Sequence, residues 1–303
     1  MTAKSNLAHS VKDRLLNIAR EAGEDFNHLL IRYALERFLY RLSQSDYHEQ
    51  FVLKGAVLFV HWYGEPHRPT LDADFHGREE LEVEELEEII RKICELNVKK
   101  DGLNFLSSSV EGEKIRVEEY YQGVKIKLIA RLGTAKIPLQ LDVGFGDSLN
   151  PAPSIIRYPT LLEFPPPELS AYQPETTIAE KFQNMVAGGI LNSRMKDYYD
   201  IWFLGREFEF EGIRLQKALH ETFRRRKTNL PVKEPPALTK DFFENQQKQA
   251  QWTGFLGKLD LSSEELSLKK VVKEIRDFLM PATAAAVRKQ PFKKRWFPGE
   301  GWK

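Results

Sequence analysis

Little in this sequence points to redox chemistry, secretion or a membrane. Cys94 is the only cysteine among 303 residues, which excludes an internal disulfide and a thiolate metal site. The chain contains no stretch of about 18 uncharged apolar residues that could span a bilayer. Residues 1–30 mix charged and apolar side chains and lack the apolar core of a secretory signal. We therefore expect a cytoplasmic globular protein.

The sequence also has almost no net charge, with 45 basic against 44 acidic residues. This balance is an average over segments of opposite sign. Residues 79–88 contain seven glutamates, whereas residues 281–303 carry six basic side chains and one acidic one. The basic segment also contains two phenylalanines and two tryptophans. Such a tail can bind a nucleic-acid backbone and stack on bases, or its aromatic side chains can pack the C-terminus onto the rest of the protein.

The hydrophobic pattern predicts helices at both ends of the chain and strands between them. Helices are expected at residues 11–22, 26–42, 79–97, 177–188, 195–204, 212–227, 239–256 and 262–279, and strands at 71–75, 115–121, 124–132 and 137–145. Seven of the 16 prolines lie between positions 151 and 174, which interrupts regular structure. We predict an α+β (mixed α/β) fold in two lobes. Residues 1–165 would form a mixed-sheet lobe with N-terminal helices, and residues 166–303 a mainly helical lobe with the basic aromatic tail.

Asp72 and Asp74 are the clearest chemical feature. Residues 71–75 alternate between apolar and acidic, which predicts a strand with Leu71 and the other apolar side chains inward and both aspartates outward on one face. Two such carboxylates can hold a divalent cation against nucleotide phosphates, and oxygen ligands suit Mg²⁺. Asp142, on another alternating segment, is the expected third carboxylate. A solvated aspartate pair on a sheet is the alternative.

A second feature lies upstream of this pair. In residues 51–60 the Lys54-Gly55-Ala56 interruption predicts a strand, a tight turn and a helix, and such a turn can offer backbone N–H groups to a phosphate. Arg68 and Thr70 stand just before the aspartates, where a guanidinium can neutralise a triphosphate, although an ordinary surface arginine explains Arg68 equally.

Five short segments, taken in order, resemble one known family. They read VLKGAVLF, RPTLDADF, LQLDVGFGD, TIAEKF and RMKDYYDIWFL. They are similar to the AbiEii/AbiGii nucleotidyltransferase toxin family, a branch of the DNA polymerase β-like nucleotidyltransferase superfamily. The resemblance extends from about Val11 to Leu204. It implies a nucleotidyltransferase-type sheet lobe, and it differs from the superfamily at Gly55-Ala56, where Gly-Ser or Gly-Gly is usual.

The resemblance also implies site residues. It makes Asp72, Asp74 and Asp142 the metal ligands, with Mg²⁺, or Mn²⁺ in its place, and it adds Lys181 and Asp197 to these three as catalytic residues. The expected nucleotide-binding residues are Lys54, Gly55, Ala56, Arg68, Thr70, Lys181, Arg194 and Lys196.

Simpler readings of the helical blocks stay open. Lys181 lies at the border of an apolar stripe, where an ordinary lysine also extends its ammonium group to solvent. Arg194 and Asp197 are three residues apart and can form a purely structural contact. Lys196 and Asp200, four apart, can pair on the surface. The cluster at residues 224–227 can bind an RNA backbone or remain solvated.

The sequence therefore predicts a Mg²⁺-dependent nucleotidyltransferase. The resemblance implies the toxin of a toxin–antitoxin pair, which transfers nucleotides from an NTP to RNA, first of all a tRNA 3′ end, and so inhibits translation. A cognate antitoxin is the expected partner, and no membrane is involved. Two alternatives remain: nucleotidylation of a protein or small-molecule hydroxyl, and a non-catalytic nucleic-acid-binding module of the same fold.

Overall fold

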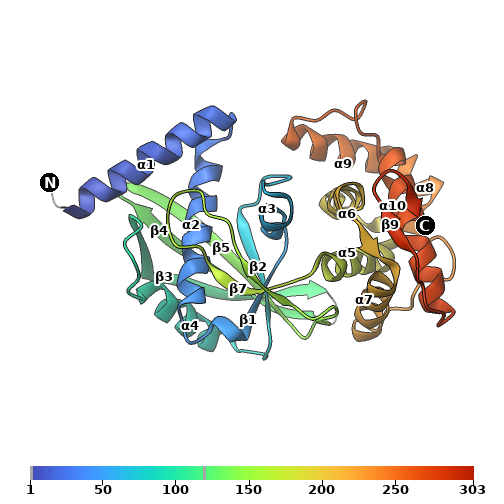
Figure 1. Ribbon diagram of the computed structural model, residues 1–303, viewed down its shortest axis with the longest axis horizontal. Helices are drawn as coiled ribbons and strands as arrows, with labels where there is room; N and C mark the ends of the chain where they lie inside the picture. The colour runs from blue at the N-terminus through green and yellow to red at the C-terminus, as the bar shows by residue number, and fades with distance from the viewer. Residues whose placement is uncertain (1–2, 119–120) are drawn as a thin grey trace. The chain divides into compact units, whose positions relative to one another are not determined.

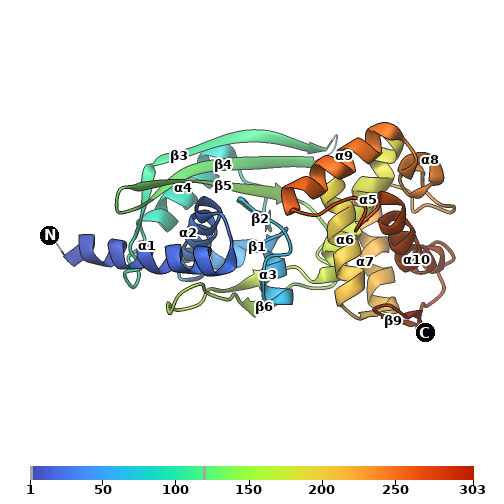
Figure 2. The same cartoon turned by 90° about the horizontal axis from the view of Figure 1, so that it is seen from above.

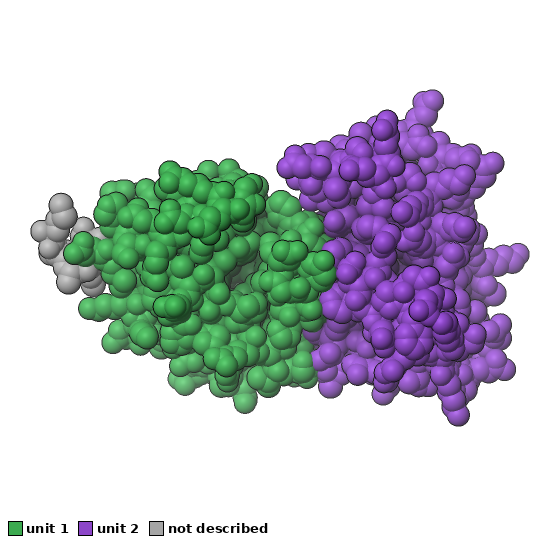
Figure 3. Space-filling model, turned by 45° about the horizontal axis from the view of Figure 1, so that its top comes forward, with its two compact units in different colours: residues 1–146, 153–171 green, residues 147–152, 172–303 purple. Residues whose placement is uncertain are grey.

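The computed structural model describes residues 3–118 and 121–303, and Figures 1 and 2 show its helices and strands. The chain divides into two compact units (Figure 3). Unit 1 comprises residues 1–146 and 153–171, and unit 2 comprises residues 147–152 and 172–303. No helix within the described ranges has both the length and the apolar composition needed to cross a bilayer.

Unit 1 is built on a mixed seven-stranded sheet with the order β3-β4-β5-β2-β1-β7-β6. The pairs β2–β5 and β1–β7 are parallel, and the other neighbours are antiparallel. The strands are β1 (Phe51–Lys54), β2 (Asp72–Gly77), β3 (Leu103–Glu118), β4 (Tyr121–Leu132), β5 (Ala135–Phe145), β6 (Ser154–Arg157) and β7 (Glu168–Ala171). The predicted mixed α/β fold is confirmed.

The helices of unit 1 are α1 (Ala3–Ala22), α2 (Phe26–Ser43), α3 (Leu58–Tyr63) and α4 (Val83–Glu95). Asp25 caps α2 by accepting a hydrogen bond from the backbone N–H of His28, which satisfies one of the free donors at that helix end. The glutamate-rich segment becomes α4, an amphipathic helix that buries Leu86 and Ile90. The strand, turn and helix predicted for residues 51–60 appear as β1, a turn and α3.

The longest strand of the sheet begins earlier than its sequence indicates. β3 starts at Leu103, whereas residues 115–121 were expected to form the strand; of that range, 119–120 lie outside the described residues. The pairing of β3 with β4 shifts register between Leu106 and Glu111. Within this irregularity the Ser109 hydroxyl accepts the backbone N–H of Ile129 at 2.9 Å. A side chain thus replaces a ladder acceptor there, and the apolar alternation of a regular strand is lost.

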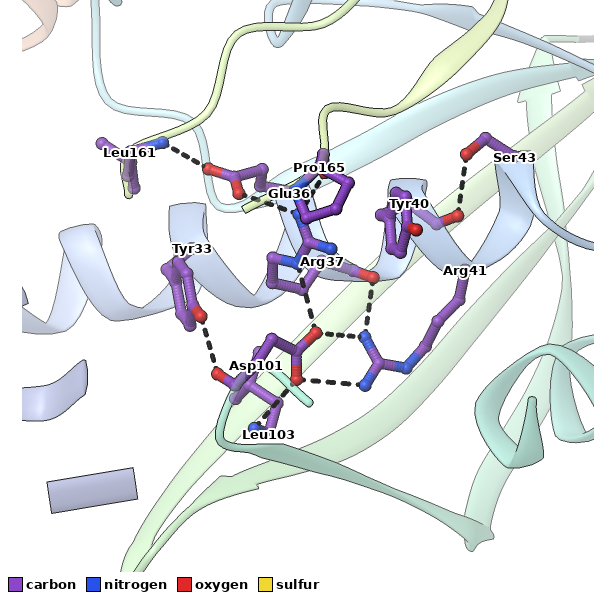
Figure 4. A network of polar contacts seen from close by, with 10 residues as sticks. All are labelled: Tyr33, Glu36, Arg37, Tyr40, Arg41, Ser43, Asp101, Leu103, Leu161 and Pro165. Atoms are coloured by element: carbon purple, nitrogen blue, oxygen red, sulfur yellow. Dashed lines mark hydrogen bonds and ion pairs between the residues drawn. The ribbon is translucent and has the colours of Figure 1, made fainter. Parts of the chain in front are cut away.

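Unit 1 contains a network of buried charges around Asp101 (Figure 4). Its carboxylate accepts hydrogen bonds from Arg37 Nε at 3.1 Å and from both Arg41 terminal nitrogens at 2.7 and 3.2 Å. Glu36, which is 2% exposed, accepts the backbone N–H of Leu161 at 2.7 Å. The network ties α2 to the segment before β3 and to the loop before β7. Sequence patterns did not indicate it, because charged residues on a helix usually face water.

Glu36 makes the stability of the fold depend on pH. Burial raises the pKa of its carboxyl from 4.5 to about 7, and the hydrogen bond from Leu161 offsets only part of this. Because the folded pKa is raised, the free energy of unfolding should fall as the pH rises from about 4.5 through 7. In Glu36→Gln we expect the free energy of unfolding to change by about 2–3 kcal/mol less between pH 5 and pH 8, as measured by denaturant unfolding. The exposed Glu21→Gln is the matched control, and an unchanged slope in Glu36→Gln would refute the assignment.

Unit 2 is mainly helical, as predicted. Its helices are α5 (Pro174–Gly188), α6 (Met195–Glu207), α7 (Gly212–Arg225), α8 (Lys240–Phe243), α9 (Gln246–Leu256) and α10 (Leu268–Val287). The predicted helix start at Thr177 is wrong, because α5 already begins at Pro174. Glu180 of this helix lies 3.6 Å from the Arg226 guanidinium. The single helix expected at 239–256 is divided into α8 and α9, since Asn245 caps α9.

The basic aromatic tail packs onto unit 2. It forms β9 (Arg295–Phe297) and β10 (Gly301–Trp302), which join β8 (Phe210–Glu211) in a small antiparallel sheet. The indole N–H groups of Trp296 and Trp302 donate to backbone carbonyls of unit 2. Of the two readings of the tail, the packing of its aromatic side chains is therefore confirmed.

Candidate active site

Four strands of unit 1 bring two aspartates and two lysines into one row. The pairing places Lys54 on β1 opposite Asp74 on β2, Asp74 opposite Asp142 on β5, and Asp142 opposite Lys125 on β4. Directly opposed residues project from the same face of a sheet. Adjacent carboxylates repel each other unless a cation or a proton compensates them. Lys54 and Lys125 lie on either side of the aspartate pair, and Lys125 also lies opposite Glu113 on β3.

The neighbouring row adds the other predicted aspartate. Asp72 lies opposite Gln140, and the Gln140 amide donates to both carboxylate oxygens of Asp142, at 3.0 and 3.1 Å. The three predicted metal ligands thus lie in two neighbouring rows of the sheet, two of them on β2 and one on β5, and all three are half-buried. On the opposite face, Ala73 and Phe75 are buried, as predicted. Leu71 is 46% exposed and precedes the strand, so its predicted inward position is wrong.

The carboxylate oxygens on this face of the sheet are the type of ligand that a hard cation prefers, and such a cation is often coordinated by the substrate as well. No group of three acidic, histidine or cysteine side chains that could hold a metal ion is found among the residues described. Mg²⁺ commonly takes only one or two carboxylates from a protein and completes its shell with water and substrate phosphates. A protein needs only one or two of the carboxylates on this face for such a site, and Mg²⁺ binding by Asp72, Asp74 and Asp142 stays a prediction.

Gly55 lies directly against the Asp74 carboxylate. Its φ is +79°, a left-handed conformation that side-chain-bearing residues rarely adopt. A Cβ atom added there would lie 2.0 Å from Asp74 Oδ2. The turn continues through Ala56, which is 7% exposed and packs inward. Glycine is thus required both for the backbone conformation and for the approach to the carboxylate, while phosphate binding by this turn stays a prediction.

Arg68 and Thr70 lie in the segment between α3 and β2, and both are half-buried. The Thr70 hydroxyl is buried and has no hydrogen-bond partner in the part of the chain that the structure describes. A buried hydroxyl without a partner is costly in the absence of water or ligand. This observation supports the predicted contact of Thr70, two residues before Asp72, with a bound molecule.

A second cluster of predicted residues lies in unit 2. The Lys181 ammonium group on α5 is 2.9 Å from carboxylate oxygens of both Asp197 and Asp200 on α6, and Arg194 Nε is 2.7 Å from Asp197. Both aspartates are fully buried. Asp200 therefore pairs with Lys181 and not with Lys196, which is exposed. The cluster contains two cations and two anions in contact.

The electrostatics of this cluster stabilise charged aspartate. Burial alone would raise the pKa of Asp197, but Lys181 and Arg194 outweigh it and hold the pKa below its usual value of 3.8. A carboxylate with a lowered pKa stabilises the fold at neutral pH, and this contribution is lost as the pH falls through the lowered pKa. The contact between Arg194 and Asp197, left open by the sequence, is therefore present.

Removal of the Lys181 charge should destabilise unit 2. Lys181→Met would leave two buried carboxylates with one partly exposed guanidinium, and we expect the free energy of unfolding to fall by about 3–5 kcal/mol. Lys196→Met, at an exposed lysine of α6, should change it by less than about 0.5 kcal/mol. Denaturant unfolding at pH 7 measures both. Equal stabilities of the two variants would contradict the structural role of Lys181.

The cluster at residues 224–227 is only partly available to a ligand. Arg226 contacts the Asp147 carboxylate at 2.9 Å and the side-chain oxygens of Gln183 and Asn184 at 2.7 Å each. Arg224 pairs with Glu221 at 2.7 Å on the surface of α7. Arg226 thus has a structural role within unit 2, which the run of basic residues in the sequence did not reveal.

The sheet face that carries Asp72, Asp74 and Asp142, here called the carboxylate face, includes two residues that the sequence did not indicate. Lys125 and Gln140 lie beside Asp142, one on a neighbouring strand and one two positions earlier on the same strand. The alternation within residues 124–132 indicates which side chains share a face. It does not show which residue of another strand lies opposite, because register depends on pairing over long sequence separations.

Comparison with known proteins points to one family. The family model for the nucleotidyl transferase AbiEii toxin of type IV toxin–antitoxin systems matches residues 37–281. JHP933 from Helicobacter pylori has a crystal structure that is 15% identical, with a TM-score of 0.48, over 86% of this chain and 94% of that chain. An H. pylori protein named as a candidate nucleotidyltransferase is 14% identical, with the same TM-score, over 86% of this chain and 97% of that chain. No curated protein matches.

Proposed function

Because the chain belongs to the AbiEii nucleotidyl transferase toxin family of type IV toxin–antitoxin systems, we propose that it uses an NTP and Mg²⁺ to nucleotidylate RNA. The observation that carries this proposal is the row of Asp74 and Asp142 flanked by Lys54 and Lys125. Carboxylates suit the metal, and the flanking ammonium groups suit the anionic phosphates of a nucleotide.

The reaction is an in-line substitution at the α-phosphorus of the NTP. A hydroxyl oxygen of the acceptor forms the new bond to phosphorus, the bond to the β-phosphate oxygen breaks, and pyrophosphate leaves. Asp72 and Asp74 would hold Mg²⁺, and the ion would neutralise part of the phosphate charge. Asp142 accepts the proton of the attacking hydroxyl or assists in holding the metal. The Gly55 turn and Arg68 bind phosphate oxygens.

The residues of unit 2 enter this proposal through the family resemblance. Lys181, Arg194 and Lys196 bind the nucleotide, and Asp197 supports catalysis. The salt bridges to Asp197 and Asp200 hold the Lys181 ammonium group in a fixed position. Lys196 is exposed and therefore accessible to an anionic ligand.

The acceptor in this proposal is RNA, with a tRNA 3′ end first, and its modification blocks translation. A cognate antitoxin encoded with the protein counteracts the toxicity. The support for a polyanionic acceptor is the family and the basic side chains on the carboxylate face.

The test uses each labelled NTP in turn with the purified full chain, Mg²⁺ and either total cellular RNA or cell lysate. We expect label in RNA of tRNA size, and EDTA should abolish it. Label in protein or in small molecules with none in RNA would overturn the acceptor assignment while retaining the chemistry. No labelled product from any NTP would overturn the transferase proposal itself.

A further inference from the structure

Unit 2 contains a pocket of about 670 Å³ with aromatic walls. Trp202 on α6 and Phe278 on α10 form part of it, and Trp296 and Trp302 of the C-terminal strands form another part. The volume is typical of sites for small molecules. The family match covers residues 37–281, so both C-terminal tryptophans lie beyond it. Trp202 and Phe278 lie within the matched range, so the C-terminal strands complete a pocket whose other walls belong to the matched region.

The three tryptophan rings are held in place by hydrogen bonds of their own. Their indole N–H groups donate from Trp202 to Glu274 Oε2 at 2.7 Å, from Trp296 to the Gly205 carbonyl at 2.6 Å, and from Trp302 to the Phe278 carbonyl at 2.8 Å. The rings of Trp296 and Trp302 also contact each other, with centroids 5.5 Å apart, and both contact Phe278, at 4.8 and 5.9 Å. Since the N–H donors are already used, the tryptophan surface that lines the pocket is aromatic carbon. A cation is the polar group that such surfaces attract.

The charge of the pocket favours a cation as well. Glu274 and Asp277 on α10 both line it, whereas Arg206 is the one basic residue in its lining within the part of the chain that the structure describes. Asp277 Oδ1 also lies 3.7 Å from Arg276 Nε. The Arg206 guanidinium lies 5.2 Å from the centre of the Trp202 ring. The Trp202 ring therefore already contacts one guanidinium group of the protein itself. A phosphate group, in contrast, would face two carboxylates.

We propose that this pocket binds a small organic cation with a guanidinium or alkylammonium head group. The head group lies against the tryptophan rings, and the carboxylates of Glu274 and Asp277 compensate its charge. Such a site is independent of nucleotidyl transfer and gives the chain a second ligand class.

Calorimetric titration of the full chain with butylguanidine and with butylurea tests the proposal, because the two probes differ in charge and hardly in shape. We expect saturable binding of butylguanidine and binding of butylurea that is at least about tenfold weaker. Equal affinities, or no saturable binding of butylguanidine at millimolar concentrations, would overturn the proposal. Binding of adenosine in place of the cation would identify a base-stacking pocket and would overturn it too.

A double variant separates the pocket from the rest of the protein. Glu274→Gln with Asp277→Asn keeps the shape of the pocket and an oxygen acceptor for Trp202. This double variant should lower the affinity for butylguanidine at least tenfold. Asp241→Asn with Glu244→Gln removes the same charge from exposed residues of unit 2 and should leave binding unchanged. Equal losses in both double variants would contradict a specific site. Titration with an acetylated Gly-Arg-Gly amide tests where the cation comes from. If the peptide binds more tightly than butylguanidine, the cation belongs to a protein partner. If the peptide binds more weakly, the cation belongs to a free metabolite.

Discussion

Asp74→Asn should reduce transfer from labelled NTP by on the order of a thousandfold, because it removes one negative charge from the proposed metal site while the side-chain shape is kept. Asp74 is the residue on which the site depends most. It lies between Lys54 and Asp142 in the row, and its carboxylate faces the Gly55 backbone. Initial rates at saturating NTP and Mg²⁺ measure the effect.

Asp46→Asn is the matched control for this substitution, since Asp46 is an exposed aspartate of the same unit. It should retain full transfer activity. Denaturant unfolding of both variants separates chemistry from folding, and we expect Asp74→Asn to remain folded because asparagine fits the same volume. Transfer by Asp74→Asn at the parent rate would show that the metal-site assignment is wrong.

The local elements of the fold were predictable because their signals lie close together in the chain. The turn at Lys54-Gly55-Ala56 and the alternation around Asp72 each occupy a few residues. The turn appears in the structure as predicted, and so does the alternation from Asp72 to Phe75, while Leu71 precedes the strand. The end of α5 at Gly188 was likewise marked by its glycine pair. Such features follow from backbone preferences and side-chain periodicity alone.

The composition of the site was less predictable, because it depends on which strands become neighbours. The sequence indicated Asp72, Asp74 and Asp142 by residue type and face, but Lys125 reaches the row only through the pairing of β4 with β5. The buried Asp101 network was missed for a related reason. Its arginines lie about 60 residues away on α2, and charged residues in an amphipathic pattern are ordinarily expected to face solvent.

The Gly55 turn should be nearly as sensitive as Asp74 itself. In Gly55→Ala the new Cβ would lie 2.0 Å from Asp74 Oδ2 and 2.8 Å from its carboxyl carbon, so the carboxylate has to move. The residue would also keep a φ of +79°, which costs about 1–2 kcal/mol for alanine. We expect transfer activity to fall by at least about a hundredfold, because displacement of a catalytic group by about 1 Å has an effect of that size. Single-turnover rates with labelled NTP measure the loss.

Gly64→Ala separates backbone strain from displacement of the carboxylate. Gly64 ends α3 with a φ of +94°, and an added Cβ there would meet no atom within 4 Å. The two variants therefore share the conformational cost, which unfolding experiments should show as similar losses of stability. Only Gly55→Ala moves Asp74, so only Gly55→Ala should lose transfer activity beyond its loss of folded protein. If both variants lost activity equally, the turn would act through stability alone, and the close approach of Gly55 to Asp74 would have no part in the chemistry.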